Sequence, residues 1–169
     1  MATEQEPLTL PAEAMRALGY RVVDMLIDHR AGLADKPVGR KAGRATLEAL
    51  LREPVPERPG DPAALLDRLE RDVFPNMLHV DHPRFFAFVP GASNFVSVMA
   101  ETLSAGLNCF AGTWYAGSGP AQVELVVIDW LRALCGLPEG AGGLFVSGGS
   151  MANLTALAVA RSAILADRT

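Results

Sequence analysis

The stretch GGLFVSGGSMANLTALAVAR, residues 142–161, joins a short apolar run to a long apolar helix pattern through a few small residues. The pattern predicts a β-strand near Leu144–Ser147, a tight turn over Ser147–Ser150, and a helix after it. A strand needs a neighbour to pair with, and no second strand is predicted with comparable clarity. The sequence therefore indicates an α/β fold whose sheet is completed by other residues.

The turn has the features of an anion site. The first N–H groups of a helix have no partner within the helix, and its dipole favours a negative charge there. Gly148 and Gly149 lack the Cβ atoms that would block close approach, and Ser150 adds a hydroxyl. Together these groups suit a phosphate. The alternative is that the two glycines only close a tight connection between strand and helix.

Two other interpretations of the turn are weaker. The nucleotide-binding patterns GxxxxGK[ST] and GxGxxG are absent, and no lysine lies near the turn. Gly148–Ala152 comes within one residue of the nucleophile elbow G-x-S-x-G, which makes a serine hydrolase with a G-x-S-x-A elbow a rival. In that fold the acid and the histidine follow the serine, whereas no histidine lies beyond His82 here. A triad in the expected order cannot be completed.

The rest of the chain is predicted to be mainly helical. Apolar residues of the first helix recur on one stripe, at Met15, Leu18, Val22, Met25 and Leu26. The predicted helices cover 11–34, 46–51, 61–74 with Asp61 as N-cap, 93–105 with Ser93 as N-cap, and 122–134. An extended piece at 85–88 and a glycine-rich loop at 106–121 separate the later helices. The first 75 or so residues offer a poor core, so we expect an arm that packs on something else.

Composition limits the partners and the compartment. The net charge of −4 argues against a nucleic-acid partner, because phosphate backbones need a basic face. The basic run at 40–44 has no interleaved aromatics and is interpreted as a solvated loop. Two widely spaced cysteines predict free thiols and no zinc site. The N-terminus lacks a signal layout and the apolar stretches are interrupted, so we expect a cytoplasmic protein with no membrane span.

Ordered blocks of the sequence resemble a known enzyme family. They are RALGYRVVDMLIDH (16–29), HPRFFAFVP (82–90), GLNCFAGTW (106–114), ELVVIDWLRALCGLP (124–138) and the opening stretch at 142–161. In this order they are similar to the pyridoxal-phosphate-dependent group II amino-acid decarboxylases, the group that includes the aromatic-L-amino-acid decarboxylases. The resemblance covers nearly the whole chain.

The resemblance implies the N-terminal part of a fold-type I transferase fold. It implies a helical N-terminal arm over residues 1–80 that clasps a second subunit in a dimer, followed over 81–169 by the beginning of a large pyridoxal-phosphate (PLP) domain. The arm agrees with the helices of the first segment, which lack a core of their own.

The resemblance also implies roles for residues in two regions. Gly149 and Ser150, with Gly148 adjacent, correspond to the contacts of the cofactor phosphate. The substrate-side loop, which reads YFPT in an aromatic enzyme of the family, corresponds to Phe88–Gly91, where Pro90 is retained but Gly91 replaces the threonine, which removes a hydroxyl contact. The loop that carries Phe110 and Trp114 lies near the partner subunit's pocket in the family. These two aromatics are therefore candidate pocket walls, with ordinary interface packing as the alternative.

The catalytic groups of the family come later than the phosphate turn. They are a Schiff-base lysine, a carboxylate on the pyridine nitrogen and a ring stacked on the cofactor. The only lysines here are Lys36 and Lys41, both before the turn, so no catalytic residue is assigned. We expect roughly the first third of an amino-acid decarboxylase, as a split subunit, a nicked product or a truncation, with a downstream polypeptide supplying the lysine. The alternative is a non-catalytic interaction protein that retains the interface.

Overall fold

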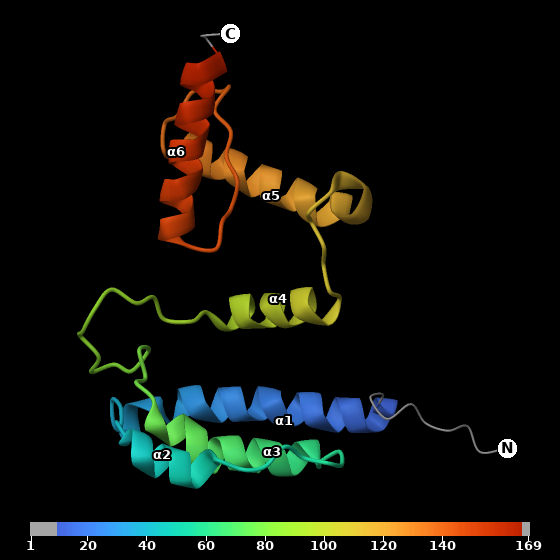
Figure 1. The fold of residues 1–169 in the computed structure, drawn as a ribbon, viewed down its shortest axis with the longest axis vertical. Helices are drawn as coiled ribbons and strands as arrows, with labels where there is room; N and C mark the ends of the chain where they lie inside the picture. The colour runs from blue at the N-terminus through green and yellow to red at the C-terminus, as the bar shows by residue number, and fades with distance from the viewer. Residues whose placement is uncertain (1–9, 167–169) are drawn as a thin grey trace, which may run out of the picture. The chain divides into compact units, whose positions relative to one another are not determined.

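The computed structural model describes residues 10–166 and divides the chain into two compact units, Met1–Asn94 and Phe95–Thr169 (Figure 1). The division between an arm over 1–80 and a cofactor domain over 81–169 stays a prediction.

The first unit is a set of helices joined by loops. It contains α1 (Ala12–Ala31), the 3₁₀ turn η1 (Leu33–Asp35), α2 (Arg44–Leu51), α3 (Pro62–Arg68), the π-helical turn η2 (Leu69–Val73) and the 3₁₀ turn η3 (Phe74–Asn76). The three helices predicted in this part are present. The predicted third helix has α geometry only as far as Arg68. It then continues as the wider π-helical turn η2 and the tighter 3₁₀ turn η3.

Asp61 begins α3 as the sequence predicts. Its Oδ1 accepts the N–H of Ala63 at 3.0 Å, and Pro62 occupies the first helical turn. The carboxylate thus satisfies one of the free N–H groups of the helix start, and the fixed φ of proline suits the first turn.

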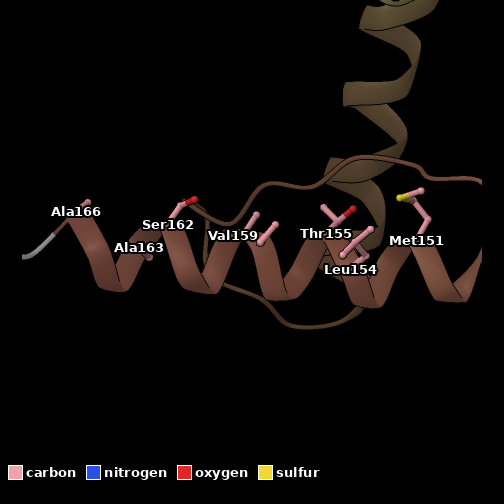
Figure 2. Close-up of a pocket in the computed structure, with 8 residues that line it drawn as sticks. Met151, Leu154, Thr155, Val159, Ser162, Ala163 and Ala166 are labelled. Atoms are coloured by element: carbon pink, nitrogen blue, oxygen red, sulfur yellow. The ribbon is translucent and has the colours of Figure 1, made fainter.

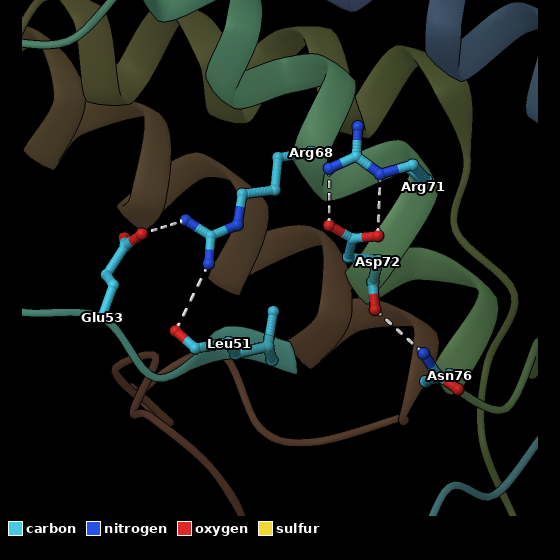
Figure 3. A network of polar contacts seen from close by, with 6 residues as sticks. All are labelled: Leu51, Glu53, Arg68, Arg71, Asp72 and Asn76. Carbon is cyan, nitrogen blue, oxygen red and sulfur yellow. Dashed lines mark hydrogen bonds and ion pairs between the residues drawn. The ribbon is translucent and has the colours of Figure 1, made fainter. Parts of the chain in front are cut away.

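Charged side chains connect the three helices of this unit. Arg21 on α1 donates to the carbonyl O of Ala63 at 3.1 Å and pairs with Asp67 on α3. Arg68 on α3 donates to Glu53 Oε2 at 2.5 Å and to the carbonyl O of Leu51, the last residue of α2, at 3.3 Å (Figure 3). These bonds join backbone and side chain across segments far apart in sequence.

A second polar group lies at the end of the same helix. Asp72 is buried, and both its oxygens accept from Arg71, at 2.9 and 2.7 Å, while Asn76 donates to the Asp72 carbonyl at 2.9 Å (Figure 3). The hydrogen bonds from Arg71 lower the pKa of Asp72 below its usual value. The paired carboxylate therefore remains charged although water is largely excluded from it.

Apolar burial within the described residues is small. Between residues 10 and 166 the one buried hydrophobic side chain is that of Leu33. The buried polar or charged side chains there are those of Asp72, His79 and His82. On the predicted stripe of α1, Met15 is 53% exposed and Val22 is 38% exposed. The expectation that the first helices form a poor core of their own is thus confirmed.

The second unit contains three helices, α4 (Phe95–Gly106), α5 (Trp114–Leu134) and α6 (Gly149–Ala166). The predicted cap at Ser93 is wrong, because α4 starts at Phe95 and Ser93 lies two residues before it. Instead, the carbonyl O and Oγ of Ser93 accept from Arg30, at 2.9 and 3.3 Å, within the first unit.

α5 starts earlier than predicted. The sequence predicts a loop as far as residue 121, but the helix begins at Trp114, and Thr113 Oγ1 accepts the N–H of Ala116 at 3.3 Å as its N-cap. Gly117 has non-helical angles, φ −149° and ψ 45°, so the helix is kinked there and resumes after it. Pro120 then falls in the first turn of the resumed helix, where its missing N–H costs nothing.

The predicted strand is absent from the structure. Across residues 10–166 no β-strand forms, and the one pairing outside helices is an isolated antiparallel bridge between Gly39 and Leu78. Leu144–Ser147 instead runs as irregular chain before α6. A strand needs the backbone of a neighbour to bond with, and the described residues offer none to this segment. The described chain is therefore mostly helical.

α6 has the length and mean hydropathy, 1.2, of a helix that could cross a membrane, and none of it is buried here. This differs from the expectation that every apolar stretch is interrupted. The core helix of a large soluble domain has the same length and composition, so this feature is weak evidence for a membrane.

Candidate cofactor site

The turn before α6 presents unbonded backbone N–H groups. The first backbone hydrogen bond of the helix runs from the N–H of Ala152 to the carbonyl O of Gly148, at 3.0 Å. The N–H groups of Gly149, Ser150 and Met151 therefore precede the hydrogen-bonded ladder and point out of the helix end. Gly148, Gly149 and Ser150 are thus brought together as the sequence predicts, at the positive end of the helix dipole.

The two glycines also leave this helix end open. Gly148 has φ +156°, a conformation that residues with a Cβ rarely adopt, so a glycine is required for the chain direction there. A Cβ placed on Gly149 would meet no atom of this chain within 4 Å. The space beside the Gly149 Cα is therefore free of other side chains of this chain. This donor set, backbone N–H groups with the Ser150 hydroxyl, fits a phosphate group.

The segment that carries Phe88, Pro90 and Gly91 belongs to the first unit. Phe88 has φ +61° without being a glycine, and its side chain is 84% exposed. A left-handed conformation at a bulky residue costs about 1–3 kcal/mol and is concentrated at functional sites. A Cβ on Gly91 would meet nothing within 4 Å. The structure thus places a strained, exposed aromatic at the start of the predicted substrate loop.

Phe110 lies in the loop before α5 and Trp114 is the first residue of that helix, both in the second unit. Both side chains are exposed, at 60% and 59%. The backbone of Phe110 lies against Gly117, since a Cβ there would be 2.0 Å from the Phe110 carbonyl O. The Phe110 ring covers Gly112, whose Cβ would be 2.5 Å from Cζ. Two glycines therefore set the position of Phe110, and sequence reasoning did not assign them that role.

Replacing Gly117 with alanine is expected to destabilise this loop. The methyl group would collide with backbone, so the 110–117 segment has to shift, at a cost of about 1–3 kcal/mol. Denaturant unfolding of the enzyme that contains this chain measures the loss. Gly119→Ala on the same helix is the matched control, because its Cβ meets nothing within 4 Å and alanine favours a helix. Equal midpoints for the two variants would show that the loop does not need this contact.

His82 is held by backbone on both ring nitrogens. It is 3% exposed; its Nδ1 accepts the N–H of Arg84 at 3.0 Å, and its Nε2 lies 3.0 Å from the carbonyl O of Lys36. Because an N–H can only donate and a carbonyl can only accept, the proton sits on Nε2. This geometry gives His82 a structural role, in which it anchors the segment that leads to the predicted substrate loop.

Two further histidines lie beside this anchor. The rings of His29 and His79 are 5.1 Å apart, and Lys36 Nζ lies 3.4 Å from His29 Nδ1. Burial lowers the pKa of His29 below its ordinary value, and the positive charge of Lys36 lowers it further. The cluster therefore favours a neutral His29 in the folded chain.

The outer face of α6 carries a shallow hollow. Its lining comes from this helix alone and includes Met151, Leu154, Thr155, Val159 and Ser162 (Figure 2). Ligand pockets are usually lined by several elements, so this apolar face has the character of a packing surface.

Glu124 is a polar residue of this unit that sequence reasoning missed. Its Oε1 accepts the N–H of Phe145 at 2.8 Å, across 21 residues of chain. The sequence gives the position of Glu124 on its helix next to the apolar stripe, but no pattern tells which backbone group it meets.

A comparison with protein families matches residues 45–167 to the pyridoxal-dependent decarboxylase conserved domain. The chain is 52% identical over 160 residues to an aromatic-L-amino-acid decarboxylase of Bacillus atrophaeus, covering 95% of this chain and 33% of that protein. It is 37% identical over 175 residues to a tyrosine decarboxylase of Oryza sativa subsp. japonica, covering 98% of this chain and 33% of that protein.

Solved structures agree with the sequence relatives. The crystal structure of Oryza sativa TDC with PLP superposes with a TM-score of 0.82 at 27% identity, covering 96% of this chain and 36% of that one. The chain thus spans about one third of the length of the relatives it matches. The chain matches the N-terminal part of these proteins, the family match over residues 45–167 includes the Gly-Gly-Ser turn, and the chain belongs to the pyridoxal-dependent decarboxylase family.

Proposed function

We propose that this chain is the N-terminal portion of a PLP-dependent decarboxylase that converts an aromatic amino acid to its amine and CO₂. The observation that carries the proposal is the Gly148-Gly149-Ser150 turn, with its open helix end and unbonded N–H groups, inside the region that matches the family. The relatives act on aromatic amino acids by name, and this supports the same substrate class here.

In this proposal the turn holds the cofactor by its phosphate. The N–H groups of Gly149 and Ser150 donate to phosphate oxygens, the Ser150 hydroxyl adds a further donor, and Gly148 allows the approach. When bound, pyridoxal phosphate supplies a ring that accepts the electron pair of the bond to the departing carboxylate. Neither Lys36 nor Lys41 follows the turn, so in this proposal the lysine that binds the cofactor belongs to the part of the enzyme downstream of these residues.

The aromatic residues of the chain form pocket walls in this proposal. Phe88 presents a large exposed face on the substrate-side loop of the first unit, and Phe110 and Trp114 present theirs in the second unit, where they would wall the pocket of the partner subunit. An aromatic face suits an aromatic substrate through stacking and excludes water from it. Pro90 restricts the loop that follows Phe88, and Gly91 leaves open space where a hydroxyl contact stands in the related loop. The choice among aromatic substrates therefore depends more on the aromatic residues that line the pocket than on a hydroxyl group at position 91.

The remaining fold follows from the same proposal. Residues 1–80 act as a helical arm, and 81–169 begin an α/β cofactor domain in which Leu144–Ser147 gains strand neighbours from downstream residues. α6 lies inside the family match, and the exposed apolar face in Figure 2 would be covered by the rest of that domain rather than by a membrane. The exposed stripe of α1 would be covered by a second subunit.

Removing residues 1–35 from the assembled enzyme is expected to weaken its dimer at least about tenfold in dissociation constant, or ~1.4 kcal/mol. The exposed stripe on α1, including Met15 and Val22, loses its apolar contacts with the partner. Analytical ultracentrifugation measures the change. Val22→Asp should act in the same direction, while Asp24→Asn on the same helix should leave the dimer unchanged. A truncated protein that dimerises with full strength would contradict the arm.

The activity is tested on the enzyme assembled from this chain and the polypeptide that completes the domain. Supplied with tyrosine, tryptophan, phenylalanine or DOPA, it should release CO₂ and the matching amine in equal amounts for at least one of them. Glutamate is the control substrate and should not react. Formation of an aldehyde in place of the amine would assign oxidative deamination instead, and no reaction with any aromatic substrate would contradict the proposal.

A further inference from the structure

Glu124 makes a long-range polar contact to the segment that leads into the phosphate turn. Its Oε1 accepts the N–H of Phe145 at 2.8 Å, and the residue is half-buried on α5. Phe145 lies two residues before Ser147, where the turn begins. A hydrogen bond from backbone to a charged carboxylate is stronger than one between neutral groups. The bond is therefore well suited to fix the position of this segment.

The contact is the last of a series along α5. Arg132 donates to the carbonyl O of Leu137 at 3.3 Å, near the end of the helix. One turn back, the Cβ position of Gly143 lies 3.5 Å from Ile128 Cγ2. Glu124 follows, one further turn back. The segment thus contacts α5 at three successive turns of that helix, and the Glu124 carboxylate is the last of these contacts before the phosphate turn.

The turn itself supplies little rigidity. Gly148 and Gly149 are adjacent glycines, which have more conformational freedom than any other residue. Leu144 and Phe145 are more than half exposed, so packing within the chain contributes little to their position. On the other side, the turn is fixed by the first hydrogen bond of α6, from Ala152 to Gly148. A second fixed point before the glycines is needed to aim the N–H groups.

We propose that Glu124 is a positioning residue for cofactor binding, which holds the 144–147 segment so that the N–H groups of Gly149 and Ser150 converge on the phosphate. This inference rests on the proposed function. Glu124 does not touch the cofactor itself; it acts through the backbone of Phe145. If Glu124 has this role, removing its carboxylate should weaken the contacts to the cofactor phosphate and leave the contacts to the cofactor ring intact.

The experiment compares two ligands on the assembled enzyme with its cofactor removed. Pyridoxal phosphate and pyridoxal, which lacks the phosphate, are titrated by absorbance into the native protein and variants. Glu124→Ala should lower the affinity for pyridoxal phosphate about tenfold, or ~1.4 kcal/mol, and change the affinity for pyridoxal by less than about twofold. Glu124→Gln keeps an oxygen that accepts the Phe145 N–H but lacks the charge, so its affinity for pyridoxal phosphate should lie between those of Glu124→Ala and the native protein. The exposed Glu139 provides the control Glu139→Ala, which should leave both affinities unchanged.

A purely structural role would give a different result. Equal losses for both ligands, or an unchanged affinity for pyridoxal phosphate in Glu124→Ala, would overturn the inference. Should Glu124→Ala fail to fold, Glu124→Asp retracts the carboxylate by one methylene and should give a smaller loss with the same dependence on the phosphate. Ser150→Ala separates the two proposals. If Ser150→Ala leaves the affinity for pyridoxal phosphate unchanged, the proposed function fails. If Ser150→Ala lowers that affinity but Glu124→Ala does not, only the role of Glu124 fails.

Discussion

Replacing Gly149 with valine is expected to lower the affinity of the assembled enzyme for pyridoxal phosphate on the order of 100-fold, or ~2.8 kcal/mol. The valine side chain would occupy the open space at the helix end and keep the phosphate away from the N–H groups of Gly149 and Ser150. Titration of the cofactor-free enzyme, followed by absorbance, gives the affinity.

The design of this variant separates binding from folding. A Cβ on Gly149 meets no atom of the chain within 4 Å, so the valine clashes with the ligand rather than with the protein. Gly140 in the preceding loop is equally open, and Gly140→Val is the matched control that should retain the native affinity. Native affinity in Gly149→Val would place the phosphate elsewhere.

Residues 1–169 expressed alone should show no decarboxylation, and activity should appear when the polypeptide with the downstream part of the domain is added. In our proposal the chain contributes the phosphate contacts, but its lysines are Lys36 and Lys41, of which Lys36 lies beside His29 in the first unit. Without the covalent lysine and the carboxylate on the pyridine nitrogen, the electron pair of the breaking bond is poorly accepted. Amine formation from aromatic amino acids, measured with and without the second polypeptide, gives the answer.

A control is needed to separate low solubility of residues 1–169 from lack of catalysis. The chain exposes many large apolar side chains, among them Leu134, Leu144 and Leu157, so low solubility alone is expected and has to be separated from lack of catalysis. Mixing with a downstream polypeptide whose cofactor lysine is replaced by alanine should restore solubility but no activity. Turnover by residues 1–169 alone would require a different catalytic group within them.

Local signals predicted the parts of the fold that depend on local chemistry. The Asp61-Pro62 pair predicted the start of α3 because a carboxylate cap and a fixed proline φ act within one turn. The Gly148-Gly149 pair predicted the turn because a backbone with φ +156° excludes most other residues. The structure brings the predicted phosphate ligands together since they are neighbours in sequence.

The errors arose where distant residues decide the structure. Gly117 and Pro120 predicted a loop, whereas Thr113 caps a helix that tolerates both through a kink. Leu144–Ser147 has strand composition, but strand formation depends on a neighbour that the described residues do not supply. Glu124 was missed because its partner, Phe145, is 21 residues away and no periodicity encodes that contact.

An experimental structure of the assembled enzyme with pyridoxal phosphate shows whether the turn before α6 holds the cofactor phosphate. We expect phosphate oxygens within about 2.7–3.2 Å of the backbone nitrogens of Gly149 and Ser150, with the Ser150 hydroxyl also hydrogen-bonded. Glu124 should still accept the N–H of Phe145 in that structure. A phosphate bound by other residues, with the Gly149 and Ser150 nitrogens facing protein or solvent, would contradict the proposed phosphate site.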